Sequence, residues 1–252
     1  MPRHMTCATP PASPATDPML SRILTSAVIA GFAAGLLAAV LQLVFVQPVL
    51  LHAELYESGQ LIHSSAEGGV SAQQDVVGFD PLRDGLSVLF SGVVYVGYAL
   101  ILVAVMAVAT DRGWGRIDAR TGILWGIAGF VTVQFAPALG LPPELPGVAA
   151  ADLQQRQIWW GGTVLATGLA CGLLAFGRNW MAWASAIVLF ALPHLIGAPQ
   201  PEVYTGPTPP ELAGEFATRA LGVGLAVWIS LGALAGALWQ REMREAGIPQ
   251  AA

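Results

Sequence analysis

The chain has 252 residues, of which 55% are hydrophobic and 11% are charged, and its formal net charge is −5. A soluble domain carries about 25% charged residues, so the composition excludes an ordinary water-soluble globular protein and indicates that most of the chain lies in lipid. The sequence contains no lysine, which excludes a P-loop nucleotide-binding motif because that motif requires one.

The two ends of the chain are predicted to lie outside the membrane domain. Residues 1–20 are rich in Pro, Ala and Thr without any period, which predicts a disordered tail. A start of translation at Met19 would remove most of this tail, and both interpretations stay open. We assign residues 21–241 to a transmembrane helical domain and residues 242–252 to a C-terminal tail.

Six apolar stretches predict an all-α polytopic membrane bundle of about six transmembrane helices, because a spanning helix needs about 20 apolar residues. They cover residues 23–51, 86–109, 121–139, 157–176, 180–197 and 217–240. The fourth and fifth stretches are separated only by residues 177–179, which fits a tight helical hairpin. The alternative is one broken or re-entrant segment, which would leave five spans; we favour six.

The arginines predict the orientation of these helices. Cytoplasmic loops carry an excess of Lys and Arg, and with the N-terminus inside, the inner segments hold eight of the eleven arginines. Eleven of the sixteen acidic residues then lie in the outer loops. We therefore expect both termini in the cytoplasm and the chain in the inner membrane of a bacterium.

Glycines one helical turn apart occur in four of the stretches. Such pairs let helix backbones approach closely in lipid, where no hydrophobic force drives helix association. They predict a compact bundle, and the pairs are Gly31/Gly35, Gly122/Gly126, Gly168/Gly172 and Gly232/Gly236.

A weak threefold pattern divides the six helices into three hairpins. Each outward-running helix has a proline followed by an acidic residue, and each returning helix begins with an acid and an arginine three or four residues apart. This spacing places both members on one helical face, and the pairs are Asp80/Arg83, Asp152/Arg156 and Glu215/Arg219. We hypothesise three related hairpins around a pseudo-threefold axis with an acidic outer mouth; the alternative is interfacial anchoring that any hairpin would show.

Apart from Arg219, near the outer end of the sixth stretch, the six apolar stretches contain no Asp, Glu, Lys or Arg. Proton-coupled pumps display an ionisable group at hydrocarbon depth, so a self-contained proton antiporter is disfavoured. The chain lacks the G-x-S-x-G and H-E-x-x-H motifs, which are typical of hydrolases and metalloproteases. We predict that the chain is not an enzyme and that it does not bind nucleic acid.

Neutral polar residues are the candidates for lining a path through the membrane. The set is Gln42, Gln47, Thr132 and Gln134. Each of them either lines an ion path or forms a hydrogen bond between helices.

Histidines and carboxylates gather at the predicted outer ends of the helices. Imidazole together with carboxylate suits first-row divalent metal ions, and an acidic mouth attracts cations. The metal-ligand candidates are His52, Glu54, Glu57, Glu144, Asp152 and His194.

Several stretches resemble the CbtA family of predicted cobalt transporter subunits. They are GFAAGL at 31–36, VQPVLLHAELYE at 46–57, FAPALGLPPELPG at 135–147, AADL at 150–153, RQIWW at 156–160 and ALPHLIGAPQP at 191–201. The resemblance covers residues 19–240. It implies a membrane subunit for uptake of Co²⁺ that serves vitamin B12 synthesis, with no bound cofactor and with a small, histidine-rich, single-span partner, CbtB.

The chain departs from this family in the loop after the first helix. Family members are described with about five spans and a histidine-bearing loop after the first helix. In this chain the corresponding residues, 58–80, contain a single histidine, His63. Any role of that loop in metal capture is therefore weaker here. His52 and His194 become stronger candidates for metal ligands. Two other functions remain open: a non-transporting scaffold or assembly subunit, and a permease for a small organic solute.

Overall fold

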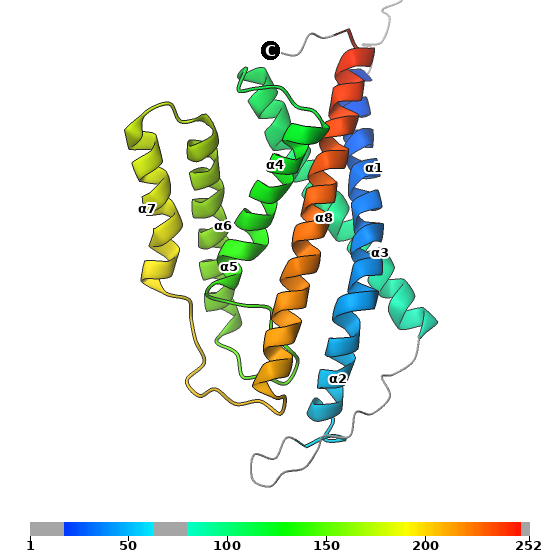
Figure 1. Cartoon of the computed structure of the whole chain (residues 1–252), viewed down its shortest axis with the longest axis vertical. Coiled ribbons are helices and arrows are strands. Elements are labelled where there is room, and N and C mark those ends of the chain that lie inside the picture. The colour runs from blue at the N-terminus through cyan, green and yellow to red at the C-terminus, as the bar shows by residue number, and fades with distance from the viewer. Residues whose placement is uncertain (1–17, 63–79, 248–252) are drawn as a thin grey trace, which may run out of the picture.

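The computed structural model describes residues 18–62 and 80–247, and all regular elements in these ranges are helical (Figure 1). The predicted N-terminal tail up to residue 17, the loop with His63 and the last five residues lie outside the described residues. The all-α prediction is thus confirmed for the part of the chain that the structure describes.

Six helical segments follow one another along the chain. The first segment runs through α1 (Pro18–Leu41), a π-helical turn η1 (Gln42–Val46) and α2 (Gln47–Glu57). The third segment is built in the same way, from α4 (Ala119–Phe130), a second π-turn η2 (Val131–Phe135) and α5 (Ala136–Ala138). The others are α3 (Pro81–Asp111), α6 (Leu153–Phe176), α7 (Trp180–Ile196) and α8 (Pro210–Glu245).

Five of these segments are long and apolar enough to cross a membrane, and α7 is a shorter apolar helix of 17 residues. The short link at residues 177–179 separates two antiparallel helices (Figure 1), so the predicted tight hairpin of α6 and α7 is confirmed. The helix α7 begins at this link because the Asn179 side chain accepts a hydrogen bond from the backbone N–H of Ala182, as an N-cap residue does.

Aspartates define three other helix starts. Asp80 caps α3, Asp118 caps α4 and Asp152 caps α6 through hydrogen bonds from backbone N–H groups. At Asp118 these bonds, foremost from the N–H of Thr121, lower the pKa of the carboxyl group, so the cap stays ionised at neutral pH.

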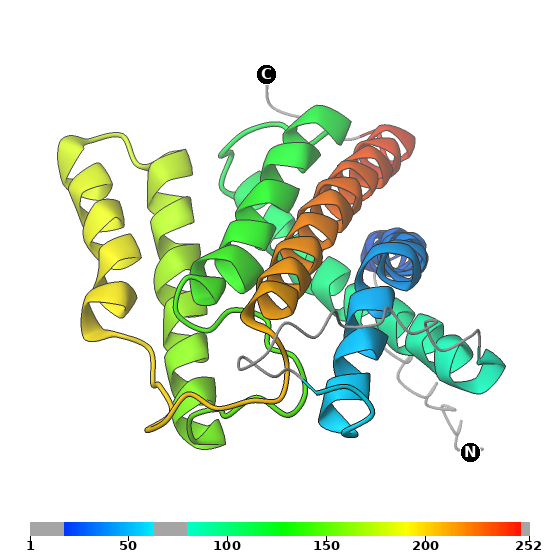
Figure 2. The same ribbon diagram turned by 60° about the horizontal axis from the view of Figure 1, so that its bottom comes forward.

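The helix α8 lies at the centre of the bundle, between α1 and α4 (Figures 1 and 2). Its glycines Gly232 and Gly236 face Gly122 and Gly126 of α4 so closely that a Cβ on Gly232 would overlap the Gly122 carbonyl. The glycine pairs predicted to bring helices together thus do so between α4 and α8.

The glycine pair of α1 has the same role against α3. A Cβ on Gly31 would lie 2.6 Å from the Cα of Val96, and one on Gly35 would lie 2.6 Å from the Cα of Gly92. The remaining predicted pair, Gly168/Gly172 of α6, behaves differently, because a Cβ on Gly172 would meet nothing within 4 Å.

The predicted arrangement of three related hairpins is wrong. The helices α1 and α3 do pack together, but α7 packs against α6 at the edge of the bundle, and α8 packs against α4 and α1 (Figures 1 and 2). The helices α7 and α8 therefore do not form the third hairpin. The glycine faces of α4 and α8 decide this pairing, because close backbone approach stabilises helix pairs in lipid.

Both π-turns occur directly before a residue–proline pair. The turn η1 precedes Gln47-Pro48 and η2 precedes Ala136-Pro137. Proline lacks an N–H and its ring clashes with the carbonyl four residues earlier, and widening the helix by one residue is a common way to accommodate a local interruption of the ladder. Pro193 lies within α7, where the described helix has no π-turn.

We expect Gly232→Ala to lower the free energy of unfolding by about 1–3 kcal/mol, because the added methyl group overpacks the α4–α8 contact. The matched control is Gly172→Ala, whose methyl group enters open space. Circular dichroism of the purified protein in detergent, followed during denaturation, measures both. Equal effects of the two substitutions would contradict the packing described for α4 and α8.

Candidate functional site

Two proline-rich loops cover one end of the bundle, at the bottom of Figure 1. These are residues 139–152, between α5 and α6, and residues 197–209, between α7 and α8. The loops contact each other: the Ala149 N–H donates to the Thr205 carbonyl at 2.8 Å, and Gln200 Nε2 donates to the Gly140 carbonyl at 3.3 Å. We call the two loops together with the end of α2 the cap.

The end of α2 reaches the same loops at Gly147. This glycine has a φ of +77°, and a Cβ on it would lie 3.2 Å from Cγ of Glu57 and 3.3 Å from Cγ of Pro207. A side chain there would therefore be both strained and crowded. The cap brings together residues of three segments that are far apart in the sequence.

Trp159 of α6 holds the cap to α7. Its buried indole Nε1 donates to the Pro193 carbonyl at 3.1 Å, and its ring lies edge-on to His194 with the ring centroids 6.0 Å apart. Gly140 provides room for the far edge of this indole, since a Cβ there would lie 2.6 Å from its Cη2. Trp159 therefore connects the cap to the end of α7 and lies beside His194.

Asp84, in the first turn of α3, is a buried carboxylate that no pattern in the sequence distinguishes from the other acidic residues at this end. The residue is 3% exposed, and its Oδ1 accepts from Gln47 Nε2 at 2.7 Å and from Arg83 Nε at 2.8 Å, while Oδ2 accepts from the Asp80 N–H at 3.1 Å. Charge-assisted bonds of this length compensate the burial of the charge. Asp84 thus ties the start of α3 to the residue directly after the π-turn η1.

Arg219 of α8 makes the corresponding connection between α8 and η1. Its Nη1 donates to the Phe45 carbonyl at 3.0 Å, and its Nη2 lies 2.5 Å from Glu215 Oε1. The predicted local pair of Glu215 and Arg219 is thus formed, and it also reaches a backbone carbonyl of a second helix.

The other two predicted acid–arginine pairs are arranged differently. Arg156 pairs with Glu144 at 2.7 Å, while Asp152 caps α6 through the Gln155 N–H. Arg83 forms an ion pair with Asp84, and Asp80 caps α3. In both cases the first acid lies at the N-cap position, where its side chain binds backbone N–H groups rather than an arginine.

The six metal-ligand candidates stand at the cap end but do not meet in one cluster. His52 is half-buried against the ring of Tyr56, with centroids 5.6 Å apart, and its buried Nε2 has no hydrogen-bond partner among the described residues. Glu54 and Glu57 are exposed on α2, and His194 is exposed at the end of α7. Within residues 18–62 and 80–247, no three His, Cys, Asp or Glu side chains lie close enough to hold a metal ion.

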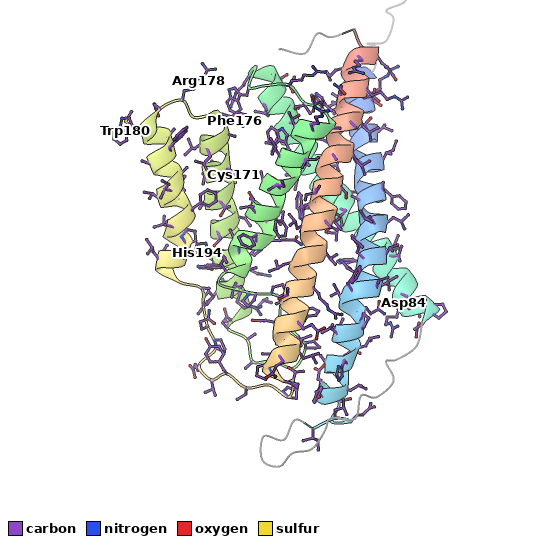
Figure 3. The ribbon with its side chains drawn as sticks, viewed as in Figure 1. Asp84, Cys171, Phe176, Arg178, Trp180 and His194 are labelled. Atoms are coloured by element: carbon purple, nitrogen blue, oxygen red, sulfur yellow. The ribbon has the colours of Figure 1, made fainter. Side chains whose placement is uncertain are left out.

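The candidate His194 and the buried Asp84 lie on opposite flanks of the bundle. Figure 3 shows His194 at the end of α7 on one side and Asp84 at the start of α3 on the other. The candidates share the negative electrostatic field at the cap end of the bundle. The described residues at this end include nine carboxylates and three arginines. The carboxylates are Glu54, Glu57, Asp80, Asp84, Glu144, Asp152, Glu202, Glu211 and Glu215, and the arginines are Arg83, Arg156 and Arg219. Such an excess raises the local concentration of cations.

The four path-lining candidates have four different environments. Gln42 is exposed on η1, Gln47 binds Asp84, and Thr132 Oγ1 lies 3.9 Å from the Cys171 sulfur of α6. Gln134 packs against Gly224 of α8, and its buried Oε1 has no hydrogen-bond partner in the part of the chain that the structure describes.

Gln134 also lines a cavity of about 210 Å³ below the cap. The walls of this cavity come from η2 and α5, from Trp160 of α6, from Ala220 and Leu221 of α8, and from the loop after α5. Most of the described side chains that line it are apolar, and Gln134 contributes an amide group.

We expect Trp159→Phe to lower the free energy of unfolding by about 0.5–2 kcal/mol, because the indole N–H that binds the Pro193 carbonyl between α6 and α7 is lost. Trp160→Phe is the matched control, since the adjacent indole is 42% exposed. Denaturation of both variants in detergent measures the difference. A larger effect at Trp160 would contradict the assignment of Trp159 as the residue that joins cap and α7.

The chain matches no curated protein and no solved structure. Residues 20–240 match the model of one protein family, described as "Probable cobalt transporter subunit (CbtA)". This range contains all six helical segments almost completely, and both loops of the cap. The chain is a multi-pass membrane protein that belongs to the CbtA family of probable cobalt transporter subunits.

Proposed function

We propose that the chain is the membrane-embedded subunit of a Co²⁺ uptake transporter that supplies vitamin B12 synthesis in a bacterium. The observation that carries this proposal is the match to the cobalt transporter family over residues 20–240. The geometry supports it, because the three longest stretches that resemble the family (46–57, 135–147 and 191–201) converge at the carboxylate-rich end of the bundle.

The cap end faces the periplasm in this proposal, and both termini face the cytoplasm. The start of α1 and the end of α8 lie together at the opposite end of the bundle (Figure 1). That end holds seven of the described arginines, namely Arg22, Arg112, Arg116, Arg120, Arg178, Arg241 and Arg244. Arginine-rich ends remain in the cytoplasm, which leaves the carboxylates of the cap to meet incoming cations.

Co²⁺ is the transported ion in this proposal, and no resident cofactor is needed. His52, Glu54, Glu57, Glu144, Asp152 and His194 would bind the ion transiently at the cap, since conduction requires binding weak enough for release. A small histidine-rich partner such as CbtB would add ligands, and the family name, which describes a subunit, supports the presence of a partner. Gln42, Gln47, Thr132 and Gln134 remain the path-lining candidates.

We expect Co²⁺ uptake by cells that express the chain with its partner to fall several-fold when His194 and Glu54 are replaced by Ala, because both are exposed ligand-type side chains at the cap. Asp111→Ala, at the exposed opposite end of α3, serves as the control. Radioactive Co²⁺ measures uptake, and immunoblotting measures expression. Unchanged uptake at normal expression would exclude these residues, and no uptake by the parent chain would exclude the function.

The orientation has its own test. In a chain whose cysteines Cys7 and Cys171 are replaced by Ser, a cysteine at position 144 should react with a membrane-impermeant maleimide added to intact cells. A cysteine at position 120, at the start of α4, should react only after the membrane is opened. The reverse pattern would place the cap in the cytoplasm and would remove the physical basis for cation collection there.

A scaffold or assembly subunit is the second candidate function. It is favoured by the finding that the described residues contain no ready three-ligand group, and that Asp84, Glu144 and Glu215 are already paired with arginines. Liposomes that contain the purified chain alone separate the two functions. Co²⁺ flux across such liposomes would exclude a scaffold without transport activity.

A further inference from the structure

Two arginines from different elements share one neutral acceptor at the end of the bundle opposite the cap. Gln240 of α8 presents its amide to Arg116, in the loop between α3 and α4, and to Arg244, one turn further along α8. In the orientation of this amide that satisfies both donors, its oxygen accepts from Arg116 Nη2 at 2.8 Å and from Arg244 Nη2 at 3.2 Å. Two positive charges that share one oxygen atom repel each other, and the amide carries no charge that compensates them.

The packing of α4 on α8 brings these groups together. A Cβ on Gly236, one turn before Gln240, would overlap the Asp118 carbonyl at the start of α4. The loop that carries Arg116 is therefore held against α8. Gly236, Gln240 and Arg244 follow one another at intervals of four residues, so they lie on the same face of α8. The two arginines thus converge because of a backbone contact between two helices.

Asp118 is the carboxylate that pairs with Arg116, and it compensates only part of the charge. It lies 3.8 Å from Arg116 Nε, and its Oδ1 also accepts from the N–H groups of Arg120 and Thr121 at the start of α4. Arg244 forms no ion pair with a carboxylate in the described part of the chain. The place where the two arginines meet therefore keeps an excess of positive charge.

The same end of the molecule contains a compensated counterpart of this pair. Arg22 of α1 and Arg241 of α8 both pair with the Glu245 carboxylate, at nitrogen–oxygen distances of 3.7 and 2.8 Å. Each pair consists of one arginine from α8 and one from another element. The acceptor differs, because Glu245 carries a negative charge and Gln240 does not. An external anion would complete the second pair as Glu245 completes the first.

The phosphate group of a membrane lipid has the chemistry that fits this place. Guanidinium groups bind phosphate oxygens through charge-assisted hydrogen bonds, and basic pockets between the ends of membrane helices bind lipid headgroups. Arg116 and Arg244 are exposed. The exposed Trp180 lies at the same end of the bundle (Figure 3), as tryptophans at a membrane–water interface do. Further along α4, the exposed Leu124 offers an apolar surface for acyl chains.

We propose that Arg116 and Arg244, together with Gln240, form a binding site for the phosphate of an anionic phospholipid. The inference goes beyond the proposed function, because it depends neither on the transported ion nor on the carboxylates of the cap. The phosphate supplies the negative charge that the Gln240 amide lacks. The bound lipid thereby links the loop between α3 and α4 to the end of α8.

Matched variants separate this site from a general attraction between lipids and basic residues. Arg116→Gln with Arg244→Gln removes the two positive charges of the site. Arg22→Gln with Arg241→Gln removes two positive charges from the compensated pair at the same end. Gln240→Glu keeps every arginine and supplies the missing negative charge from within the chain. Native mass spectrometry of the purified full-length chain in detergent measures the binding of phosphatidylglycerol, with zwitterionic phosphatidylcholine as the control lipid.

We expect the parent chain to bind phosphatidylglycerol in preference to phosphatidylcholine. The loss of both site arginines and the Gln240→Glu substitution should each weaken phosphatidylglycerol binding at least about tenfold, because the charge-assisted bonds are removed or satisfied within the chain. The variant without Arg22 and Arg241 should stay within about twofold of the parent, since it keeps the site. An excess of inorganic phosphate should not displace the lipid, because free phosphate lacks the acyl chains.

Equal losses in the two double variants would overturn the inference, since diffuse attraction would then explain the binding. Unchanged binding in Gln240→Glu, no preference of the parent for phosphatidylglycerol, or displacement of the lipid by inorganic phosphate would also overturn it. Circular dichroism checks that each variant is folded. If the variant without Arg116 and Arg244 does not fold, Gln240→Glu decides the question. If neither folds, the two arginines have a structural role only and the inference is refuted.

Discussion

The close contact between the glycine faces of α4 and α8 is the constraint on which the rest of the structure depends. Helices in lipid gain little from burying apolar side chains, so packing of the backbones themselves has to stabilise the pair. Gly122, Gly126, Gly232 and Gly236 permit this approach. Since α8 also packs against α1, the two helices that carry π-turns are held on either side of α8.

This arrangement explains why the polar groups gather where they do. Each π-turn interrupts the hydrogen-bond ladder next to a proline, and each lies against the first half of α8. Arg219 binds a carbonyl of η1, and Gly224 gives space to Gln134 of η2. The prolines next to the π-turns, Gly224 and Arg219 thus meet where the two π-turns lie against α8.

The sequence predicted the elements of the fold better than their lateral arrangement. Hydropathy located all six helices and their alternating direction, because the spacing of apolar stretches determines when the chain crosses the bundle. It did not predict that α7 packs on α6 while α8 lies at the centre, since hydropathy contains no information about neighbours. The glycine pair of α8 was recognised as a packing signal, but the helix it would meet could not be read from one sequence.

The candidate site was predicted in location and not in detail. The acidic end and the exposed positions of Glu54 and His194 follow from where the apolar stretches stop. The pairing of Asp84 with Gln47 did not, because these residues are 37 positions apart and meet only after α3 has crossed α1. Asp80 and Asp152 were assigned to arginines because the helical spacing allowed it, whereas the N-cap position directs both side chains to the backbone.

The position of α8 between the two π-turns is tested most directly by disulfide cross-linking in membranes. In a chain without Cys7 and Cys171, a cysteine pair at positions 134 and 224 should cross-link under mild oxidation. A pair at positions 45 and 219, where the long Arg219 side chain makes the contact, should cross-link with a short bismaleimide reagent. A pair at positions 191 and 221, which would join α7 to α8, should not cross-link with either treatment. Cross-linking of the α7–α8 pair, with none at the two π-turns, would contradict the account.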